Sequence, residues 1–394
     1  MEEWVGEVKQ RALLGKPLIS GGRSNKLGKY GFDDLTFVPK QLTGRPIDYF
    51  KEEIKSETII GKTSKHPLKL SGPIMISAMS FGSLSKEAKI ALAKASSMAG
   101  TCTNTGEGGM LPEERTNAKI LIAQYSTGRF GVDDNYINSA DAIEIKIGQG
   151  AKPGQGGMLP ADKVTEEISK LRGVPMGKDV HSPPSHPDIV TINDLKNKVK
   201  WLRKITDGKP IIIKIGAGNV EKDIKLAMKA KPDAIAIDGM EGGTGAAPRI
   251  MLDDFGIPTL SAIVIARKAM GKTKQELIVS GGLSKGADVA KALALGADAV
   301  YMAMPCLVAM GCIYCKQCFA GKCPVGITTQ IPELRSKLVP DEAAMNIAKF
   351  LTSCTEEVKM AAGACGKKNI HLLNRDDLRS LSLLAEKVTK IPLA

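Results

Sequence analysis

Eight short apolar runs, most of them closed by glycine-rich or polar residues, constrain the fold of this chain more than any other feature. They cover residues 73–78, 101–105, 120–124, 142–147, 210–215, 234–238, 277–280 and 299–302. Most are rich in β-branched residues or alanine and show no polar alternation, which is typical of parallel strands buried on both faces. The sequence therefore predicts eight parallel strands in one sheet.

Helical periodicity follows several of these runs, over residues 84–98, 221–231, 260–270 and 287–295, with Ser83 or Ser85 placed to cap the first helix. Strand and helix units repeated eight times predict an α/β fold, a (β/α)8 TIM barrel, with a doubly wound open sheet as the alternative. We expect three parts: an N-terminal wrapping extension at 1–70, the barrel at 71–330, and a C-terminal helical tail at 331–394 with helices near 341–360 and 376–387.

A cysteine-rich loop, within residues 306–326, follows the last predicted strand. Its cysteines are Cys312, Cys315, Cys318 and Cys323. Closely spaced soft thiolates favour an iron–sulfur cluster. Two alternatives stay open: a structural zinc site, which usually pairs cysteines across a longer gap, and a pair of disulfides. The other four cysteines are scattered, which in a reducing compartment is typical of free thiols.

Composition narrows the classes of function. The 55 Lys and Arg residues exceed the 42 Asp and Glu residues, but they are spread along the chain, and aromatics make up only 4%. This distribution permits nucleic-acid binding but does not argue for it, since it forms no concentrated basic patch with stacking residues. It better suits an anionic cofactor and substrate, with an acidic electron-transfer partner. The start, Met1-Glu-Glu-Trp-Val, lacks the features of a secretion signal, and no eighteen-residue apolar run occurs. We expect a cytoplasmic protein that does not enter membranes.

Glycine-rich loops and two lysines mark the expected site. Glycines cluster after the runs ending at 105, 147, 238 and 280. The strands' carboxyl ends carry the chemistry of TIM barrels, and the last two loops bind phosphate where a phosphate is bound. For any single loop, the alternative is that its glycines only form a turn and bind no ligand. Lys146 and Lys214 lie within strands predicted to be buried. A buried ammonium group needs an anionic or hydrogen-bonding partner, unless its side chain extends to the end of the strand. Lys214 is also suited to neutralise charge on a reduced cofactor ring.

Seven motifs occur in the order in which one known family carries them. They are Met79-Ser-Phe-Gly-Ser-Leu-Ser, Asn104-Thr-Gly-Glu-Gly-Gly, Thr127-Gly-Arg-Phe-Gly-Val, Glu144-Ile-Lys-Ile-Gly-Gln-Gly-Ala-Lys-Pro-Gly, Ser182-Pro-Pro-Ser-His-Pro-Asp, Glu241-Gly-Gly-Thr-Gly-Ala and Cys323-Pro-Val-Gly-Ile-Thr-Thr-Gln. Through them, residues 73–330 resemble the FMN-binding synthase domain of glutamate synthase, particularly its archaeal-type and stand-alone members. The resemblance implies an FMN barrel, an iron–sulfur cluster beside the flavin, and reductive amination of 2-oxoglutarate to glutamate with electrons passed from the cluster to FMN.

The resemblance also implies site residues. The positions similar to the family's flavin contacts are Ser77, Ala78, Met79, Asn104, Gln124, Lys146 and Lys214, with the phosphate at Gly281, Gly282, Met302 and Ala303. Lys152 and Arg172 are similar to its 2-oxoglutarate contacts, and Arg129 is either a further anion contact or part of a salt bridge. Lys214, Glu107 and Lys146 are the candidate catalytic groups. Met158 stands where the family has a glutamine.

The cluster type is left open by one departure from the family. Members hold a three-iron, four-sulfur cluster on cysteines similar to Cys312, Cys318 and Cys323, and this chain adds Cys315. A fourth thiolate is compatible with a four-iron, four-sulfur cluster.

The family also implies partners. Full-length members carry glutaminase and β-helix domains that this sequence does not contain, so we expect ammonia from solution or from a separate glutaminase subunit. The glycines at 216–221 do not complete a dinucleotide fingerprint. We therefore expect electrons from ferredoxin or from an NAD(P)H-oxidising flavoprotein.

Three alternative functions remain. An N-methylglutamate synthase subunit would use an alkylamine in place of ammonia. A non-catalytic FMN and iron–sulfur electron-transfer subunit would not need Lys152 or Arg172. An FMN-dependent hydroxyacid oxidase would need a catalytic histidine, for which His186 is the candidate, and would leave the cysteine loop unexplained.

Overall fold

The computed structural model describes residues 3–24, 26 and 30–394, and its centre is a parallel eight-stranded barrel. The strands are β5 (Ile74–Ile76), β6 (Thr103–Asn104), β7 (Leu121–Tyr125), β8 (Ala142–Lys146), β11 (Ile211–Gly216), β12 (Ala234–Asp238), β14 (Glu276–Ser280) and β15 (Ala299–Met302). They pair in the order β5-β15-β14-β12-β11-β8-β7-β6, and a hydrogen bond from Ile76 N to Cys102 O joins the two ends. The predicted TIM barrel and its eight strands are confirmed.

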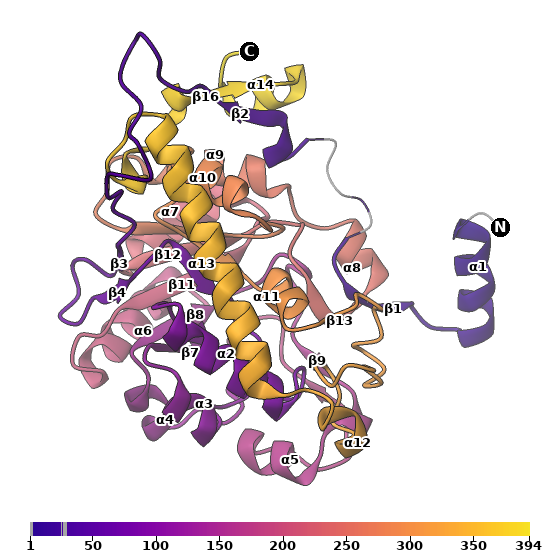
Figure 1. The fold of residues 1–394 in the computed structure, drawn as a ribbon. Coiled ribbons are helices and arrows are strands. Elements are labelled where there is room, and N and C mark those ends of the chain that lie inside the picture. Colours follow the sequence, from indigo (N-terminus) through magenta and orange to yellow (C-terminus); the bar gives the residue numbers. More distant parts are fainter. Residues whose placement is uncertain (1–2, 25, 27–29) are drawn as a thin grey trace.

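A ring of helices follows the strands along the chain and surrounds the sheet (Figure 1). Its members are α2 (Lys86–Met98), α3 (Pro112–Asn117), α4 (Asp134–Ser139), α6 (Ile192–Ile205), α7 (Val220–Lys229), α9 (Thr259–Met270), α10 (Gly286–Ala294) and α11 (Met304–Ala309). The four predicted helices are confirmed to within two residues at each end. Of the two candidate caps, Ser85 caps α2, because its side chain accepts a hydrogen bond from Ala88 N.

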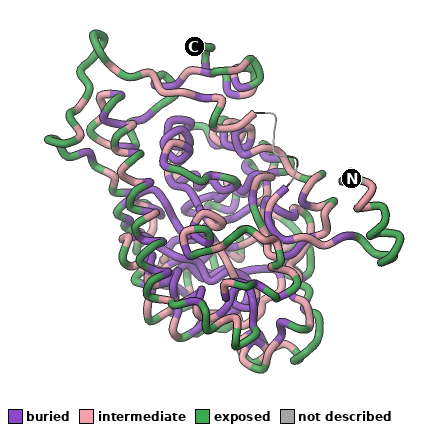
Figure 2. The backbone as a smooth tube through the Cα atoms, turned by 45° about the vertical axis from the view of Figure 1, so that its right-hand side comes forward, coloured by how far each residue is buried: buried purple, intermediate pink, exposed green. Residues whose placement is uncertain are grey.

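A short hairpin closes the end of the barrel at which the strands begin. Strands β3 (Thr58–Ile60) and β4 (Leu68–Leu70) pair antiparallel and lead directly into β5. Ile60, Leu68 and Leu70 pack in one buried cluster with inward-facing strand residues such as Ile212 and Ile278. Figure 2 shows that the buried segments of the chain gather towards the centre of the molecule. The hairpin therefore seals this end with apolar side chains.

The opposite end, at which the strands finish, carries two long insertions. After β8 come β9 (Met158–Leu159), a 3₁₀ turn (Ala161–Lys163), α5 (Glu166–Arg172) and β10 (Val180–His181), with β9 and β10 paired antiparallel. After β12 come β13 (Thr244–Pro248) and α8 (Arg249–Asp253). Strand β1 (Ile19–Gly22) pairs antiparallel with β13, so the N-terminal segment reaches the mouth of the barrel.

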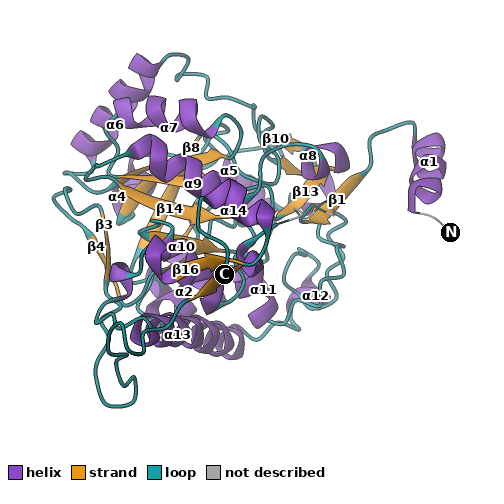
Figure 3. Ribbon diagram, turned by 90° about the horizontal axis from the view of Figure 1, so that it is seen from above, coloured by secondary structure: helices purple, strands orange, loops and turns teal. Residues whose placement is uncertain are grey.

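The chain termini differ in part from expectation. Helix α1 (Glu3–Leu14) was not predicted, and it projects from the barrel (Figures 1 and 3). Met1 and Glu2, which belong to the argument against a secretion signal, lie outside the described residues. In the C-terminal tail, α12 (Pro332–Arg335) precedes α13 (Pro340–Ala364), which packs on α2 and α10 and confirms the helix predicted at 341–360.

The single helix predicted over 376–387 is wrong. A 3₁₀ turn (Arg375–Asp377) leads into β16 (Leu378–Ser380), which pairs with β2 (Leu35–Phe37) beside another 3₁₀ turn (Phe32–Asp34), and only α14 (Leu383–Thr389) is helical. The Asn374 side chain caps the turn at 375–377, and Ser382 starts α14, so two caps break the segment. A further 3₁₀ turn covers Ile370–Leu372. None of the helices in the described residues has the length and apolar character needed to cross a bilayer.

Candidate active site

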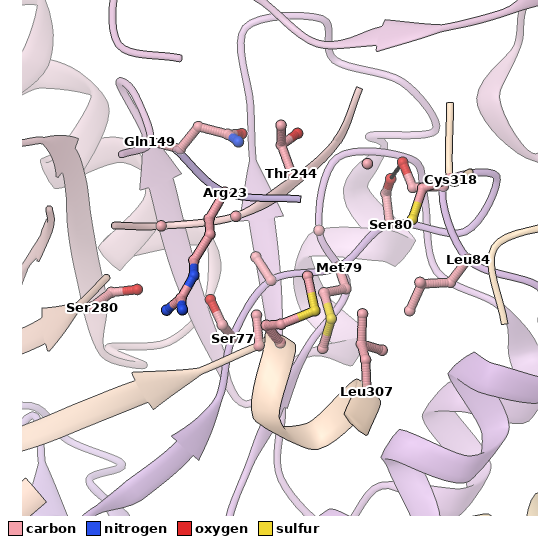
Figure 4. Close-up of a pocket in the computed structure, with 18 of the residues that line it drawn as sticks. Arg23, Ser77, Met79, Ser80, Leu84, Gln149, Thr244, Ser280, Leu307 and Cys318 are labelled. Carbon is pink, nitrogen blue, oxygen red and sulfur yellow. Dashed lines mark hydrogen bonds between the residues drawn. The ribbon is translucent and has the colours of Figure 1, made fainter. Parts of the chain in front are cut away.

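A cavity of about 740 Å³ opens where the strands end, a size typical of small-molecule sites. Side chains from strand ends and from both insertions line it, and Figure 4 shows part of its wall. The predicted site residues that line it are Ser77, Ala78, Met79, Glu107, Gln124, Lys146, Lys152, Arg172, Lys214, Gly281, Gly282, Ala303, Cys312 and Cys318. The structure therefore gathers most of the predicted site in one place.

Several predicted residues lie behind or beside this cavity. Asn104 is buried and donates to Glu144 Oε1 at 3.0 Å, and Met302 accepts a backbone hydrogen bond from Ser77. Both support the lining from behind. Arg129 is ion-paired with Asp188, so of its two proposed roles the structure shows the salt bridge.

The cavity carries an excess of positive charge. Its lining includes five cations and three carboxylates; the cations are Arg23, Lys146, Lys152, Arg172 and Lys214, and the carboxylates are Glu107, Asp238 and Glu241. A concave site with this balance attracts anionic ligands.

Lys214 and Asp238 form a buried pair at the ends of β11 and β12. Lys214 Nζ lies 3.6 Å from Asp238 Oδ2, which also accepts from Gly150 N at 3.0 Å. The partner that a lysine in a buried strand needs is therefore present. Asp238 Oδ1 has no hydrogen-bond partner among the residues that the structure describes, although both side chains are less than a tenth exposed. A buried, unpaired carboxylate oxygen facing a cavity is typical of a ligand contact.

Glu107 and Lys146 form a second pair, with Lys146 Nζ 3.0 Å from Glu107 Oε2. Burial alone would raise the pKa of Glu107, but the charge of Lys146, hydrogen bonds from Ser182 and Lys146, and a smaller effect of Arg172 lower it to about 2. Glu107 is therefore ionised at neutral pH, and among the described residues its Oε1 has no hydrogen-bond partner.

Two buried cations stand beside these pairs. Lys152 donates to Ala246 O at 2.9 Å, and burial, with a smaller contribution from Lys146, lowers the pKa of Lys152 to about 8. Arg172 donates through one terminal nitrogen to Ser80 Oγ and Phe81 O, while its Nε has no hydrogen-bond partner within residues 3–24, 26 and 30–394. Buried cations with unused donors are suited to hold the carboxylates of a ligand.

Two motif glycines make room for Arg172. A Cβ at Gly108 would lie 2.7 Å from the Arg172 terminal nitrogen, and one at Gly82 would lie 3.0 Å from it. Gly82 also has φ +102°, a conformation that favours glycine. The motifs at 79–85 and 104–109 therefore contribute the space in which the guanidinium sits.

The cysteine loop lies next to the cavity. Cys312 and Cys318 line both the cavity and a smaller neighbouring pocket, and Cys315 and Cys323 line the smaller pocket. Lys163 Nζ fixes the loop by donating to Ser83 O, Cys318 O and Thr328 O at 3.0–3.4 Å. Four thiols around one pocket are donors of the type that bind an iron–sulfur cluster or a zinc ion.

The environment of Cys323 also fits that donor set. Burial alone would raise the pKa of Cys323, but hydrogen bonds from the chain at Thr328, Val325 and Ile327 lower it, which favours a thiolate. All eight cysteines are free thiols. Within the described residues, no three Cys, His, Asp or Glu side chains already converge on one metal position.

His186 is placed away from the cavity lining. Its Nδ1 lies 2.6 Å from Arg129, and its Nε2 lies 2.8 Å from Lys146 O, so both ring nitrogens are engaged. Burial, helped by Arg129, lowers the pKa of His186 to about 4. The histidine base that a hydroxyacid oxidase would need is therefore not offered by His186.

Sequence reasoning missed several lining residues, among them Arg23, Gln149, Ser182, Asp238 and Glu241. Asp238 could have been found, since it is the only charged residue in the apolar run 234–238 and closes it. Arg23 carried no comparable signal, because the pairing of β1 with β13 joins segments far apart in the sequence.

Comparison with known proteins agrees with this site. Residues 32–368 match the family described as the conserved region in glutamate synthase. The chain belongs to the glutamate synthase family. The resemblance drawn from the motifs is thus confirmed, and with it the assignment to the oxidoreductases.

Two relatives illustrate the match. A glutamate synthase large subunit-like protein of Rhizobium meliloti is 39% identical over 412 residues, covering 99% of this chain and 93% of that protein. An archaeal-type glutamate synthase [NADPH] of Thermotoga maritima is 40% identical over 409 residues, covering 97% of this chain and 80% of that protein.

Similar solved structures support the fold. A mandelate oxidase variant superimposes with a TM-score of 0.58 at 16% identity, covering 92% of this chain and 94% of that one. A lactate oxidase of Pediococcus acidilactici gives a TM-score of 0.60 at 15% identity, covering 92% of this chain and 89% of that one. At this identity the likeness concerns the fold alone.

Proposed function

We propose that this chain binds FMN and an iron–sulfur cluster and catalyses the reductive amination of 2-oxoglutarate to L-glutamate. The observation that carries the proposal is the pair of buried cations, Lys152 and Arg172, in the same cavity as the Lys214–Asp238 pair, in a member of the glutamate synthase family. A dicarboxylate needs two such cations, and an electron-transfer subunit would need neither.

The residues present fit FMN. Ser77, Ala78, Met79, Gln124, Lys146 and Lys214 would hold the ring end, and Gly281, Gly282 and Ala303 the phosphate. The unpaired Asp238 Oδ1 and the left-handed Gly281 and Gly282, with φ of +109° and +78°, support this placement. When bound, the flavin would supply hydride transfer to the substrate.

The chain's own residues then bind and orient the substrate. Lys152 and Arg172 would hold its two carboxylates, which fixes the reacting carbon in the cavity. Lys146, paired with the ionised Glu107, would donate a proton from its Nζ to the substrate. Orientation and proton supply are therefore the tasks assigned to these four side chains.

The four cysteines would hold the cluster, which supplies electrons from a partner. Three thiolates suffice for a three-iron cluster, and Cys315 permits a fourth iron. The donor is proposed to be ferredoxin or an NAD(P)H-oxidising flavoprotein, and ammonia to come from solution or from a separate glutaminase subunit. Electron paramagnetic resonance spectra of wild-type protein and of Cys315→Ser distinguish the two cluster types. Removing the Cys315 thiol should change the spectrum of a four-iron cluster and leave that of a three-iron cluster unaltered.

The test is anaerobic turnover by protein reconstituted with FMN, iron and sulfide. After chemical reduction, 2-oxoglutarate and ammonium are added together and separately, while flavin absorbance and glutamate are followed. Re-oxidation with glutamate formation only when both are present supports the proposal. Reduced flavin that persists with both compounds contradicts it.

A second candidate is favoured by Met158, which lines the cavity and carries a thioether where the family has an amide. An apolar side chain at this position suits an alkylamine better than ammonia. If the chain is an N-methylglutamate synthase subunit, methylamine should replace ammonium in the same experiment, and Met158→Gln should shift the preference towards ammonium.

A further inference from the structure

The N-terminal segment reaches into the cavity mouth. Strand β1 pairs with β13, with Ile19 opposite Pro248 and Gly22 opposite Thr244. On its other side it lies against the cysteine loop, since a Cβ at Gly21 would be 3.2 Å from the Cβ of Cys318. The segment is thus held between the insertion after β12 and the cysteine loop.

Arg23, directly after β1, points from this segment into the cavity. It lines the cavity, and within the described residues it forms no hydrogen bond or ion pair. Figure 4 shows its guanidinium group reaching between Ser77 and Ser280. Ser77 follows β5 and Ser280 ends β14, and β15 lies between these strands in the sheet. The guanidinium therefore lies over the seventh, eighth and first strands of the barrel.

The backbone beside Ser280 is fixed in a shape suited to an anion. Gly281 and Gly282 both have positive φ, and a Cβ at Gly281 would lie 2.5 Å from Thr259 Oγ1. Thr259 Oγ1 donates to Gly281 O at 2.8 Å, and Glu241 Oε2 accepts from Thr259 N, also at 2.8 Å. The carboxylate of Glu241 is therefore engaged with Thr259, whereas Arg23, next to this loop, has no ion-pair partner in the part of the chain that the structure describes.

We propose that Arg23 binds the phosphate group of the flavin mononucleotide, so that the N-terminal segment forms one wall of the cofactor site. The inference rests on the proposed FMN function and adds a residue to it. Guanidinium groups bind phosphate oxygens through two parallel hydrogen bonds, which also orients the ligand. Binding of the phosphate would in turn hold β1 against β13.

The experiment compares FMN with riboflavin, which has the same ring but no phosphate. Deflavinated wild-type protein and the variants Arg23→Gln and Arg23→Lys are titrated with each flavin, and quenching of flavin fluorescence gives the dissociation constants. For Arg23→Gln we expect FMN affinity to fall roughly 10- to 100-fold and riboflavin affinity to stay within about twofold. Arg23→Lys should give an intermediate loss for FMN.

Lys26→Gln is the matched control, since Lys26 lies on the same segment but pairs with Asp254 in solvent. It should leave both affinities unchanged. Equal losses of FMN and riboflavin in Arg23→Gln, or no loss of either, would overturn the role of Arg23. Wild-type protein that binds neither flavin would instead overturn the proposed cofactor, so the two failures are distinguishable.

Discussion

The two ends of the barrel interior have opposite chemistry. Where the strands begin, Met75, Ile122, Ile212 and Ile278 pack against the β3–β4 hairpin, and each is fully buried. Where the strands finish, the same inward-facing positions carry Lys146, Lys214 and other polar groups, some of whose buried atoms lack partners.

The difference shows how one sheet divides its tasks. Apolar burial stabilises the fold at about 25 cal/mol per Å². Buried charges cost free energy unless they are paired, so unpaired atoms such as Asp238 Oδ1 are retained for a ligand. The account therefore predicts that changes at the apolar end affect stability alone. Changes at the polar end should affect binding and turnover, and stability as well where they leave a buried charge without its partner.

The largest effect is expected from the double variant Lys152→Met/Arg172→Met. Removing both buried cations should lower kcat/KM for 2-oxoglutarate on the order of 1000-fold, because each charge-assisted contact contributes roughly 10- to 100-fold. Steady-state glutamate formation measures this. Lys209→Met is the control, since Lys209 precedes β11 and donates to Asn138 O and Ala140 O away from the cavity. If Lys209→Met lowered kcat/KM as much as the double variant does, the effect would not be specific to the polar end of the barrel.

A cavity at the apolar end should act on stability alone. Ile212→Ala removes buried side-chain volume and should lower the free energy of unfolding by about 3 kcal/mol. Denaturant unfolding gives this value, and a flavin titration under folding conditions should give the wild-type affinity. If flavin affinity fell while stability stayed unchanged, the apolar end would have a role in binding.

Substitutions in the Lys214–Asp238 pair should affect both stability and flavin binding. Lys214→Met leaves the buried Asp238 without its cation and should cost about 3 kcal/mol of stability, whereas Lys214→Met/Asp238→Asn should recover most of this loss. The amide oxygen introduced by the second substitution would still accept from Gly150 N. Both variants should bind FMN weakly. A double variant that remains as unstable as the single one, measured by denaturant unfolding, would contradict the account of the pair.

The smallest effect concerns pH. Burial lowers the pKa of Lys152 to about 8, so in the unliganded protein this side chain loses its charge as pH rises above 8. KM for 2-oxoglutarate should rise about tenfold per pH unit there, and Lys152→Arg should flatten the profile. Between pH 8 and the usual lysine range, the unfolded chain binds more protons at this site, so its contribution makes stability rise with pH. A KM that stays flat to about pH 10 would exclude Lys152 as a charged contact.

The sequence predicts the fold better than it predicts the wall of the site. Strand runs and capped helices such as Ser85–Met98 are local signals, and they are found where expected. The segment 376–387 fails because pairing of β16 with β2 overrides helical periodicity. Arg23 enters the cavity through an equally distant pairing, which no local pattern reveals. Lys214 was recognisable because a charge in a buried strand demands a partner.

The most direct test is the absorbance spectrum of bound FMN during titration with 2-oxoglutarate. The account predicts one flavin per chain, a saturable spectral change in wild-type protein and in folded Ile212→Ala, and loss of that change in Arg172→Met with flavin still bound. A spectral change that survives in Lys152→Met/Arg172→Met would show that the dicarboxylate binds elsewhere and would contradict the assignment of the polar end.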